Sequence, residues 1–128
     1  MIVDSSAVVC VLMREPEYER VIKRLVEAEF IGIGAPTLTE TGIVVLARFP
    51  FDPLGRLSRF MQEFGISVVP FGEAHWQEAV DAYARYGKGR HPAALNFGDC
   101  LSYATSKLAA QPLLCTGDDF AQTDLELA

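Results

Sequence analysis

Residues 96–108 read Asn-Phe-Gly-Asp-Cys-Leu-Ser-Tyr-Ala-Thr-Ser-Lys-Leu, and they predict the helix around which the chain is organised. Apolar and small residues recur along this stretch at helical spacing, which indicates a buried face. Asn96 or Gly98 can cap the start of the helix. Asp99 then falls in the first turn, where the helix dipole stabilises an anion. Local sequence therefore explains Asp99 as a helix-start carboxylate, and a further role depends on where the other carboxylates lie.

On both sides of this helix, short apolar runs alternate with amphipathic helical patterns. The apolar runs predict strands, at residues 1–3, 31–35, 66–70 and 112–115. The helical patterns begin near Ser5, Tyr18, Pro36, Pro53 and Gly72. This alternation predicts an α/β fold, with a mainly parallel sheet of four or five strands and helices on both faces. The length of the chain favours a single domain spanning residues 1–128.

Two helical segments carry more specific expectations. Thr37 and Glu40 match the Thr-x-x-Glu capping box, which places a helix start at residues 36–37 and gives Glu40 a structural explanation. Between residues 72 and 86, four hydrophobic side chains at helical spacing predict an inward face, and these are Trp76, Ala79, Val80 and Tyr83.

Composition limits the classes of function. With 11 basic against 17 acidic residues the net charge is -6, which argues against binding to nucleic acid through bulk electrostatics. No apolar run reaches transmembrane length, and a strand that begins at Met1 leaves no room for a signal peptide, so we expect a cytoplasmic protein. Cys10, Cys100 and Cys115 lie in apolar segments without zinc-type spacing, which predicts buried, reduced thiols.

A local group of cations interrupts the acidic sequence. No acidic residue occurs between Asp81 and Asp99, whereas residues 85–91 contain Arg85, Lys88, Arg90 and His91. Tyrosines at positions 83 and 86 accompany these cations, and such a combination suits a phosphate backbone with exposed bases. The alternative is a solvent-exposed loop made flexible by its glycines.

Four carboxylates are expected to converge on one edge of the sheet. Asp4 and Asp118 follow predicted strands, and Glu40 and Asp99 lie in predicted first turns of helices, which can face the same edge. Two carboxylates ~4 Å apart repel by about 4 kcal/mol at an effective dielectric near 20, so a cation or protonation is required. Oxygen ligands without His or Cys favour Mg²⁺ or Mn²⁺. The pattern therefore predicts metal-assisted hydrolysis of phosphodiester bonds.

Four motifs along nearly the whole chain resemble the PIN-domain ribonucleases, in particular the VapC toxins of bacterial toxin–antitoxin pairs. The motifs are Ile-Val-Asp4-Ser-Ser-Ala, the Thr-x-x-Glu40 helix start, Asn-Phe-Gly-Asp99-Cys-Leu-Ser-Tyr-Ala and Leu-Leu-Cys-Thr-Gly-Asp118-Asp-Phe. The resemblance implies a three-layer α/β/α PIN-like fold and a metal-binding, catalytic set of Asp4, Glu40, Asp99 and Asp118. It makes Asp119 a further candidate ligand, and Ser6 or Thr116 a supporting hydroxyl.

The same resemblance implies partners. It implies a homodimer, inhibition by a cognate VapB-like antitoxin, and cleavage of a structured RNA (tRNA or rRNA) that inhibits translation. The apolar faces of residues 18–26 and 57–64 are candidate antitoxin-binding surfaces, although core packing explains them nearly as well.

Three other classes of protein are alternatives to a nuclease, and the first two lack required residues. A phosphoacceptor signalling domain needs an acceptor Asp after its third strand, where this chain has Pro70-Phe71-Gly72, and a late Lys, where it has Thr116-Gly117. A dehalogenase-type phosphatase needs Asp-x-Asp after the first strand, but position 6 is serine. A catalytically silent interaction module with the same fold stays open, because sequence cannot show that a metal binds.

Overall fold

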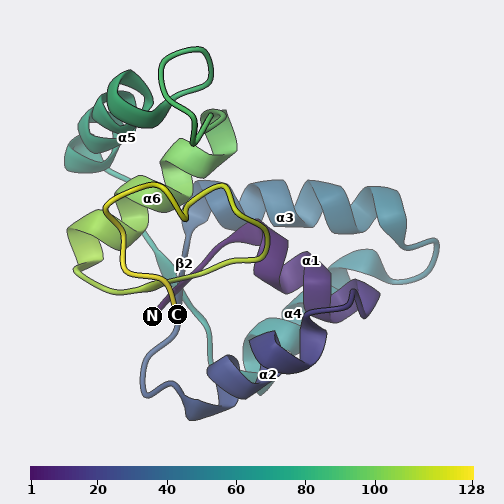
Figure 1. Cartoon of the computed structure of the whole chain (residues 1–128). Coiled ribbons are helices and arrows are strands. Elements are labelled where there is room, and N and C mark those ends of the chain that lie inside the picture. Colours follow the sequence, from purple (N-terminus) through teal and green to yellow (C-terminus); the bar gives the residue numbers. More distant parts are fainter.

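A computed structural model describes all residues from 1 to 128 and contains one parallel sheet (Figure 1). The strand order is β3-β2-β1-β4, and Ile2 pairs with Gly32 on one side and with Leu113 on the other. The strands span β1 Ile2–Val3, β2 Gly32–Gly34, β3 Ser67–Val69 and β4 Leu113–Leu114. Leu127 adds an isolated bridge to Leu113 at the outer edge. The predicted α/β fold with a parallel sheet is confirmed.

Six helices surround this sheet and complete three layers. They are α1 Ser5–Met13, α2 Tyr18–Glu27, α3 Ala35–Arg48, α4 Pro53–Glu63, α5 Glu73–Tyr86 and α6 Phe97–Ala109. Helices α1, α2 and α4 pack on one face of the sheet, and α5 and α6 lie on the other (Figure 1). Helix α3 runs beside the sheet and contacts α1, α4 and α6. None of the six helices has the combination of length and hydrophobicity that a membrane span requires.

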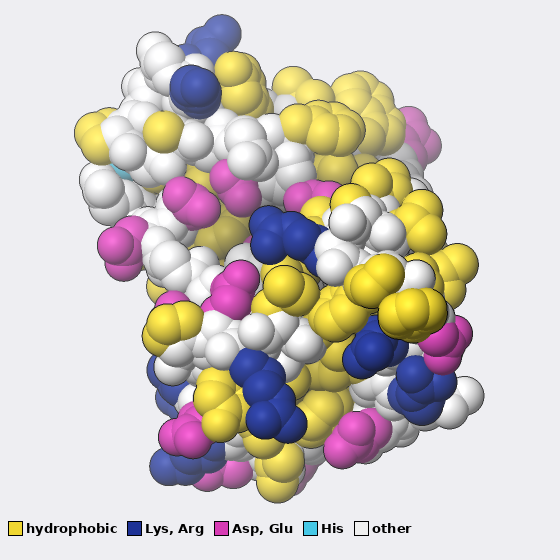
Figure 2. All heavy atoms as spheres, turned by 90° about the vertical axis from the view of Figure 1, so that its right-hand side faces the viewer, with side chains coloured by type: hydrophobic (Ala, Val, Ile, Leu, Met, Phe, Trp, Pro, Cys, Tyr) yellow, Lys and Arg dark blue, Asp and Glu magenta, His cyan; other side chains and the backbone are white.

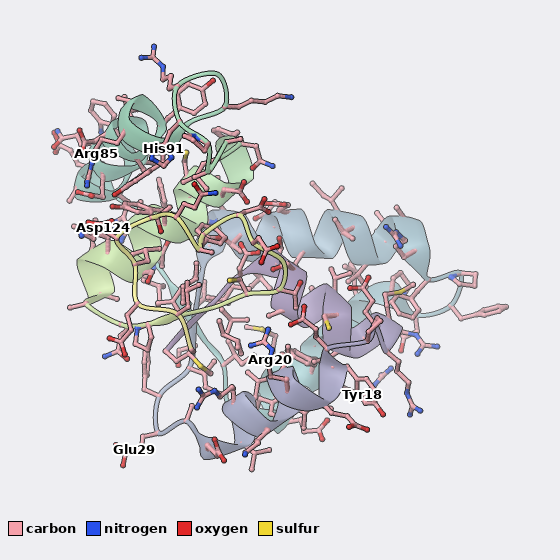
Figure 3. The ribbon with its side chains drawn as sticks, viewed as in Figure 1. Tyr18, Arg20, Glu29, Arg85, His91 and Asp124 are labelled. Carbon is pink, nitrogen blue, oxygen red and sulfur yellow. The ribbon has the colours of Figure 1, made fainter.

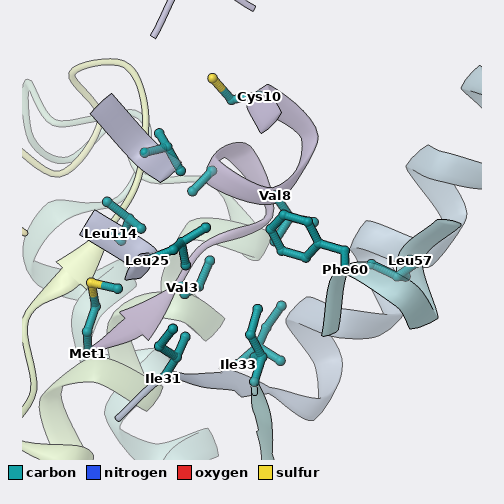
Figure 4. Packing of buried hydrophobic residues seen from close by; sticks show 13 residues of the cluster. Met1, Val3, Val8, Cys10, Leu25, Ile31, Ile33, Leu57, Phe60 and Leu114 are labelled. Atoms are coloured by element: carbon teal, nitrogen blue, oxygen red, sulfur yellow. The ribbon is translucent and has the colours of Figure 1, made fainter. Parts of the chain in front are cut away.

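Two clusters of buried hydrophobic residues lie on opposite faces of the sheet. Successive residues of a strand point to opposite faces, so Val3 joins the cluster with Val8, Leu25 and Phe60 (Figure 4). Ile2 joins the second cluster, which includes Tyr103 of α6. All three cysteines are free and buried, as predicted.

Helix α6 packs closely against β2. A Cβ atom added to Gly34 would lie 2.7 Å from Thr105 Oγ1, so a larger residue at position 34 would collide with α6. Asn96, not Gly98, caps α6 by accepting a hydrogen bond from Asp99 N at 2.9 Å. The first turn of α6, with Asp99, is thereby fixed relative to the strands.

The prediction that four side chains of α5 face inward is wrong for three of them. Trp76, Val80 and Tyr83 are 54%, 60% and 41% exposed, whereas Ala79 and Ala82 are buried. Helix α5 packs mainly on α6, and small side chains allow the two backbones to approach closely. Hydrophobic spacing located a helix correctly but did not identify which of its faces is covered.

Candidate active site

Asp4 lies at the carboxyl end of β1 and is only 5% exposed. Its Oδ2 accepts hydrogen bonds from Ser6 N at 3.0 Å and Ser6 Oγ at 2.6 Å, so it caps α1. Its Oδ1 accepts a hydrogen bond from Ser102 Oγ of α6 at 2.5 Å. Two elements far apart in the sequence therefore hold both oxygens of this carboxylate.

Glu40 faces Asp4 from the second turn of α3, and the predicted capping box is wrong. Helix α3 begins at Ala35, directly after β2, and Gly34 is its cap. Glu40 Oε1 instead accepts a hydrogen bond from Ser5 Oγ at 3.3 Å. Burial raises the pKa of Glu40, and the charge of Asp4 raises it further, while the Ser5 hydrogen bond lowers it. Glu40 thus belongs to the acidic group and not to the helix start.

Asp99 has both the helix-start role and acidic neighbours. Its Oδ2 accepts a hydrogen bond from Asn96 N at 3.0 Å, which completes a reciprocal cap. Burial raises the pKa of Asp99 to about 6; the Asn96 bond lowers it, and the charges of Asp119, Asp4 and Glu40 raise it. The ionised form of Asp99 is therefore destabilised by its surroundings.

The loop after β4 contributes the fourth carboxylate. Thr116 N donates to Ser6 Oγ at 3.1 Å, which joins this loop to the start of α1. The charge of Asp119 contributes to the raised pKa of Asp99 and to that of the buried Cys115 thiol, which burial mainly raises to about 12. Asp118 and Asp119 are both exposed, and Asp118 is not among the charges that raise either pKa.

The donor chemistry of this acidic group fits a hard divalent cation. Its four members, Asp4, Glu40, Asp99 and Asp119, offer only carboxylate oxygens, which Mg²⁺ and Mn²⁺ prefer. No three of the chain's Asp, Glu, His and Cys side chains are grouped closely enough to hold a metal ion in this structure. Burial, followed by repulsion from the other carboxylates, raises the pKa of Asp99, and a cation would offset both effects.

Comparison with known proteins defines the family. Residues 1–125 match the PIN domain family. The chain is 48% identical over 129 residues to ribonuclease VapC36 of Mycobacterium tuberculosis, and the match covers 98% of this chain and 91% of the relative. The chain belongs to the VapC family of PIN-domain ribonucleases. Ribonuclease VapC of Mycolicibacterium smegmatis is a further relative, 38% identical over 98% of this chain and 97% of its own.

Solved VapC structures share the fold. The M. tuberculosis toxin VapC20, which cleaves the sarcin-ricin loop, superposes with a TM-score of 0.79 at 14% identity, over 99% of this chain and 97% of its own. VapBC2 of Rickettsia felis, solved with a DNA fragment from its promoter, gives a TM-score of 0.76 at 12% identity, over 99% and 96%. These likenesses confirm the predicted PIN fold.

In this VapC chain, the structure divides the predicted cationic group into two parts. Arg85 donates to Tyr86 Oη at 3.0 Å and lies 3.5 Å from Asp124 Oδ2, and Figure 3 shows both residues on the same side of the molecule. His91 Nδ1 accepts a hydrogen bond from Ala93 N at 3.0 Å. Arg85 and His91 therefore make structural contacts. Lys88 and Arg90 are exposed and form no ion pair.

Sequence reasoning missed three polar residues of this VapC chain. Ser102 lies in the buried face of α6, three residues after Asp99, and a serine at that position was an available signal. Ser5 follows Asp4 at the start of a helical pattern, and nothing in the local sequence indicates that its hydroxyl contacts Glu40. Asp124, in a tail without a readable pattern, accepts hydrogen bonds from Lys107 Nζ at 2.6 Å and Tyr103 Oη at 2.5 Å, and these lower its pKa to about 2.

A groove of about 750 Å³ opens beside the acidic group of this VapC chain. Glu40 and Gly98 lie in its wall, together with Ile43, Phe71 and Phe97. The groove thus combines an acidic end with an apolar wall formed by α3 and α6.

Proposed function

We propose that this chain, as a single domain spanning residues 1–128, is the toxin of a type II toxin–antitoxin system. In this proposal it is a Mg²⁺-dependent endoribonuclease that cleaves a structured RNA, tRNA or rRNA, and so inhibits translation. The observation that carries the proposal is geometric: buried Asp4 has its two oxygens held by Ser6 and Ser102, and Glu40 is hydrogen-bonded to the adjacent Ser5. Burial and the charges of Asp119, Asp4 and Glu40 raise the pKa of Asp99, which supports the same grouping. The curated relatives are named ribonucleases, which supports the same chemistry here.

Each carboxylate has a role in this proposal. Asp4 and Asp99 are the main metal ligands, because hydrogen bonds from Ser6, Ser102 and Asn96 fix them. Glu40 and Asp119 complete the ligand set and orient the attacking water. We favour Asp119 over Asp118 because only Asp119 acts on the pKa of Asp99. Bound Mg²⁺ supplies Lewis-acid chemistry, which activates water and neutralises the phosphate.

Removal of the metal tests the proposal. We expect purified wild-type protein to cleave total cellular RNA with Mg²⁺ or Mn²⁺ and to lose this activity in excess chelator, because the carboxylates alone cannot neutralise the phosphate. Mapping of the cleaved sites identifies the RNA, and re-addition of metal should restore the same sites. If the protein does not cleave RNA and does not bind Mn²⁺ in calorimetry, the catalytically silent module is favoured instead.

Gly98 gives a test of the position of Glu40. A Cβ atom at Gly98 would lie 2.6 Å from Glu40 Oε2, so Gly98→Ala must displace this carboxylate. Alanine also favours a helix over glycine by about 0.5–1 kcal/mol. We therefore expect Gly98→Ala to keep or raise the melting temperature but to lower kcat/KM for RNA cleavage about 10- to 100-fold.

Gly42→Ala is the matched control. It also replaces a helical glycine, but its Cβ would meet only Leu57 Cδ2 at 3.8 Å, an ordinary contact. This variant should have wild-type activity and at least wild-type stability. Equal activity in the two variants would contradict the role of Glu40.

We infer that the cationic loop, residues 87–91 after α5, positions RNA through Lys88 and Arg90, with Arg85 and His91 supporting the loop. Both cations are exposed, and the Arg90 guanidinium lies 5.9 Å from the centre of the Tyr83 ring. Such cations contact phosphates without reading sequence.

Lys88→Ala combined with Arg90→Ala should raise KM for RNA several-fold, leave kcat nearly unchanged, and weaken the dependence of KM on salt, because two phosphate contacts are lost. Mn²⁺ affinity should not change. The control removes the same charge from α2, through Lys23→Ala with Arg24→Ala, both exposed. If the control raises KM equally, net charge and not this loop is responsible.

We also propose that a VapB-like antitoxin binds this chain. A groove between α1, α2 and α4 contains apolar Tyr18, Ile22 and Phe60 and the cations Arg14 and Arg56. The face at the far end of α3 likewise shows hydrophobic and basic side chains, with acidic side chains among them (Figure 2). This combination suits a peptide with hydrophobic and acidic residues.

A homodimer is proposed through the apolar surface of α3, α5 and α6. Its exposed side chains include Ile43, Leu46, Trp76, Val80 and Phe97, and apolar patches of this kind mark protein interfaces.

A further inference from the structure

A chain of buried hydroxyl groups joins α3 to Asp4 through α6. Ser102 Oγ donates to Asp4 Oδ1 at 2.5 Å, which commits its single proton. Thr37 Oγ1 lies 3.2 Å from Ser102 Oγ. Since Ser102 has no second proton, Thr37 must be the donor in this bond. Thr37 and Ser102 are each 1% exposed, so water has little access to replace either bond.

The hydroxyl chain links the elements that carry three of the four carboxylates. Thr37 lies three residues before Glu40 on α3, and Ser102 lies three residues after Asp99 on α6. Residues three apart share one side of a helix, so each hydroxyl lies on the same side of its helix as a carboxylate of the acidic group. The end of β1 supplies Asp4 as the final acceptor.

We infer that Thr37 is a positioning residue, which acts through Ser102 to fix Asp4 and the spacing of α3 against α6. This inference rests on the proposed metal-dependent nuclease function. Hydrogen bonds in series polarise one another, so donation by Thr37 strengthens the bond from Ser102 to Asp4. Groups that orient metal ligands commonly change metal affinity or activity about 10- to 100-fold.

Thr41 provides a matched control on the same helix. It is 0% exposed, and its Oγ1 donates to Thr37 O at 2.7 Å, but it is not hydrogen-bonded to Ser102 or Asp4. Thr37→Val and Thr41→Val each replace a buried hydroxyl by a methyl group of similar shape. Their effects on thermal stability should therefore be comparable, while only Thr37→Val breaks the hydroxyl chain.

The first measurement is Mn²⁺ binding to the full chain by calorimetry, without RNA. Thr37→Val should weaken binding about tenfold, whereas Thr37→Ser and Thr41→Val should bind as the wild type does. Ser102→Ala should weaken binding further. Addition of Thr37→Val to Ser102→Ala should cause no extra loss, because Thr37 acts through Ser102. Wild-type affinity in Thr37→Val, equal losses in both valine variants, or additive losses would overturn the inference.

Proton NMR tests the chain without any metal. The buried Ser102 hydroxyl proton should give a slowly exchanging downfield signal that is absent from Ser102→Ala, shifted in Thr37→Val and unchanged in Thr41→Val. An unshifted signal in Thr37→Val would overturn the inference. If the wild type binds no Mn²⁺, the proposed nuclease function fails, and this signal still decides whether Thr37 acts on Ser102.

Discussion

Asp99→Asn is expected to abolish metal-dependent RNA cleavage while stabilising the metal-free protein above pH 6. Loss of a main metal ligand removes several kcal/mol of transition-state stabilisation, which corresponds to about a thousandfold or more in rate. The fold should survive, because an asparagine oxygen can still accept the hydrogen bond from Asn96 N that completes the cap of α6.

The effect on stability follows from the raised pKa of Asp99. A carboxyl whose pKa is about 6 in the folded protein, against an ordinary value of 3.8, binds a proton more tightly in the folded state. Its contribution to stability is therefore present below pH 4 and is lost as the pH rises through 6. Asparagine has no such titration, so the melting temperatures of wild type and variant should diverge between pH 4 and pH 7.

Thermal melts without metal across this pH range, together with cleavage assays, measure both effects. Glu29→Gln is the control, because Glu29 is exposed, lies just beyond the end of α2 and is at the edge of the molecule (Figure 3). It should change neither the pH profile nor the activity. Full cleavage activity in Asp99→Asn would reject the assignment of the metal site.

The second large effect separates two neighbouring aspartates. Asp119→Asn should reduce kcat/KM about a hundredfold or more, because Asp119 lies where its charge acts on Asp99. Asp118→Asn should retain most of the activity. Each variant removes one charge from the same loop, so each is the control for the other.

The assay is cleavage of one RNA at a fixed Mg²⁺ concentration, with Mn²⁺ affinity measured in parallel. If Asp118→Asn loses more activity than Asp119→Asn, then Asp118 is the fourth carboxylate of the site, as the sequence alone predicts.

Local chemistry made some features of this chain predictable. Alternating patterns located the strands and helices, because hydrophobic spacing and turn residues act over a few neighbouring positions. The cap of α6 and the place of Asp99 in its first turn follow from Asn96 and Asp99 themselves. The acidic motifs then indicated the family, which the comparison with VapC36 confirms.

Other features depend on distant parts of the chain. A Thr-x-x-Glu pattern suggested a cap at Glu40, but β2 runs directly into α3 and Ser5 binds the carboxylate instead. The hydrophobic spacing of α5 suited more than one face, and close packing against α6 selected the face with Ala79 and Ala82. The small size of the side chains at the contact between α5 and α6 decided which face is buried, and their hydrophobicity did not.

Local sequence was sufficient to predict the α/β architecture and the position of Asp99 in the first turn of α6. Only the tertiary structure brought Ser102 and Thr37 next to Asp4 through a line of hydrogen bonds. The physical reason is range: caps and helical spacing join residues a few positions apart, whereas the hydrogen bond from Ser102 to Asp4 spans 98 positions and exists only after α6 packs on the sheet.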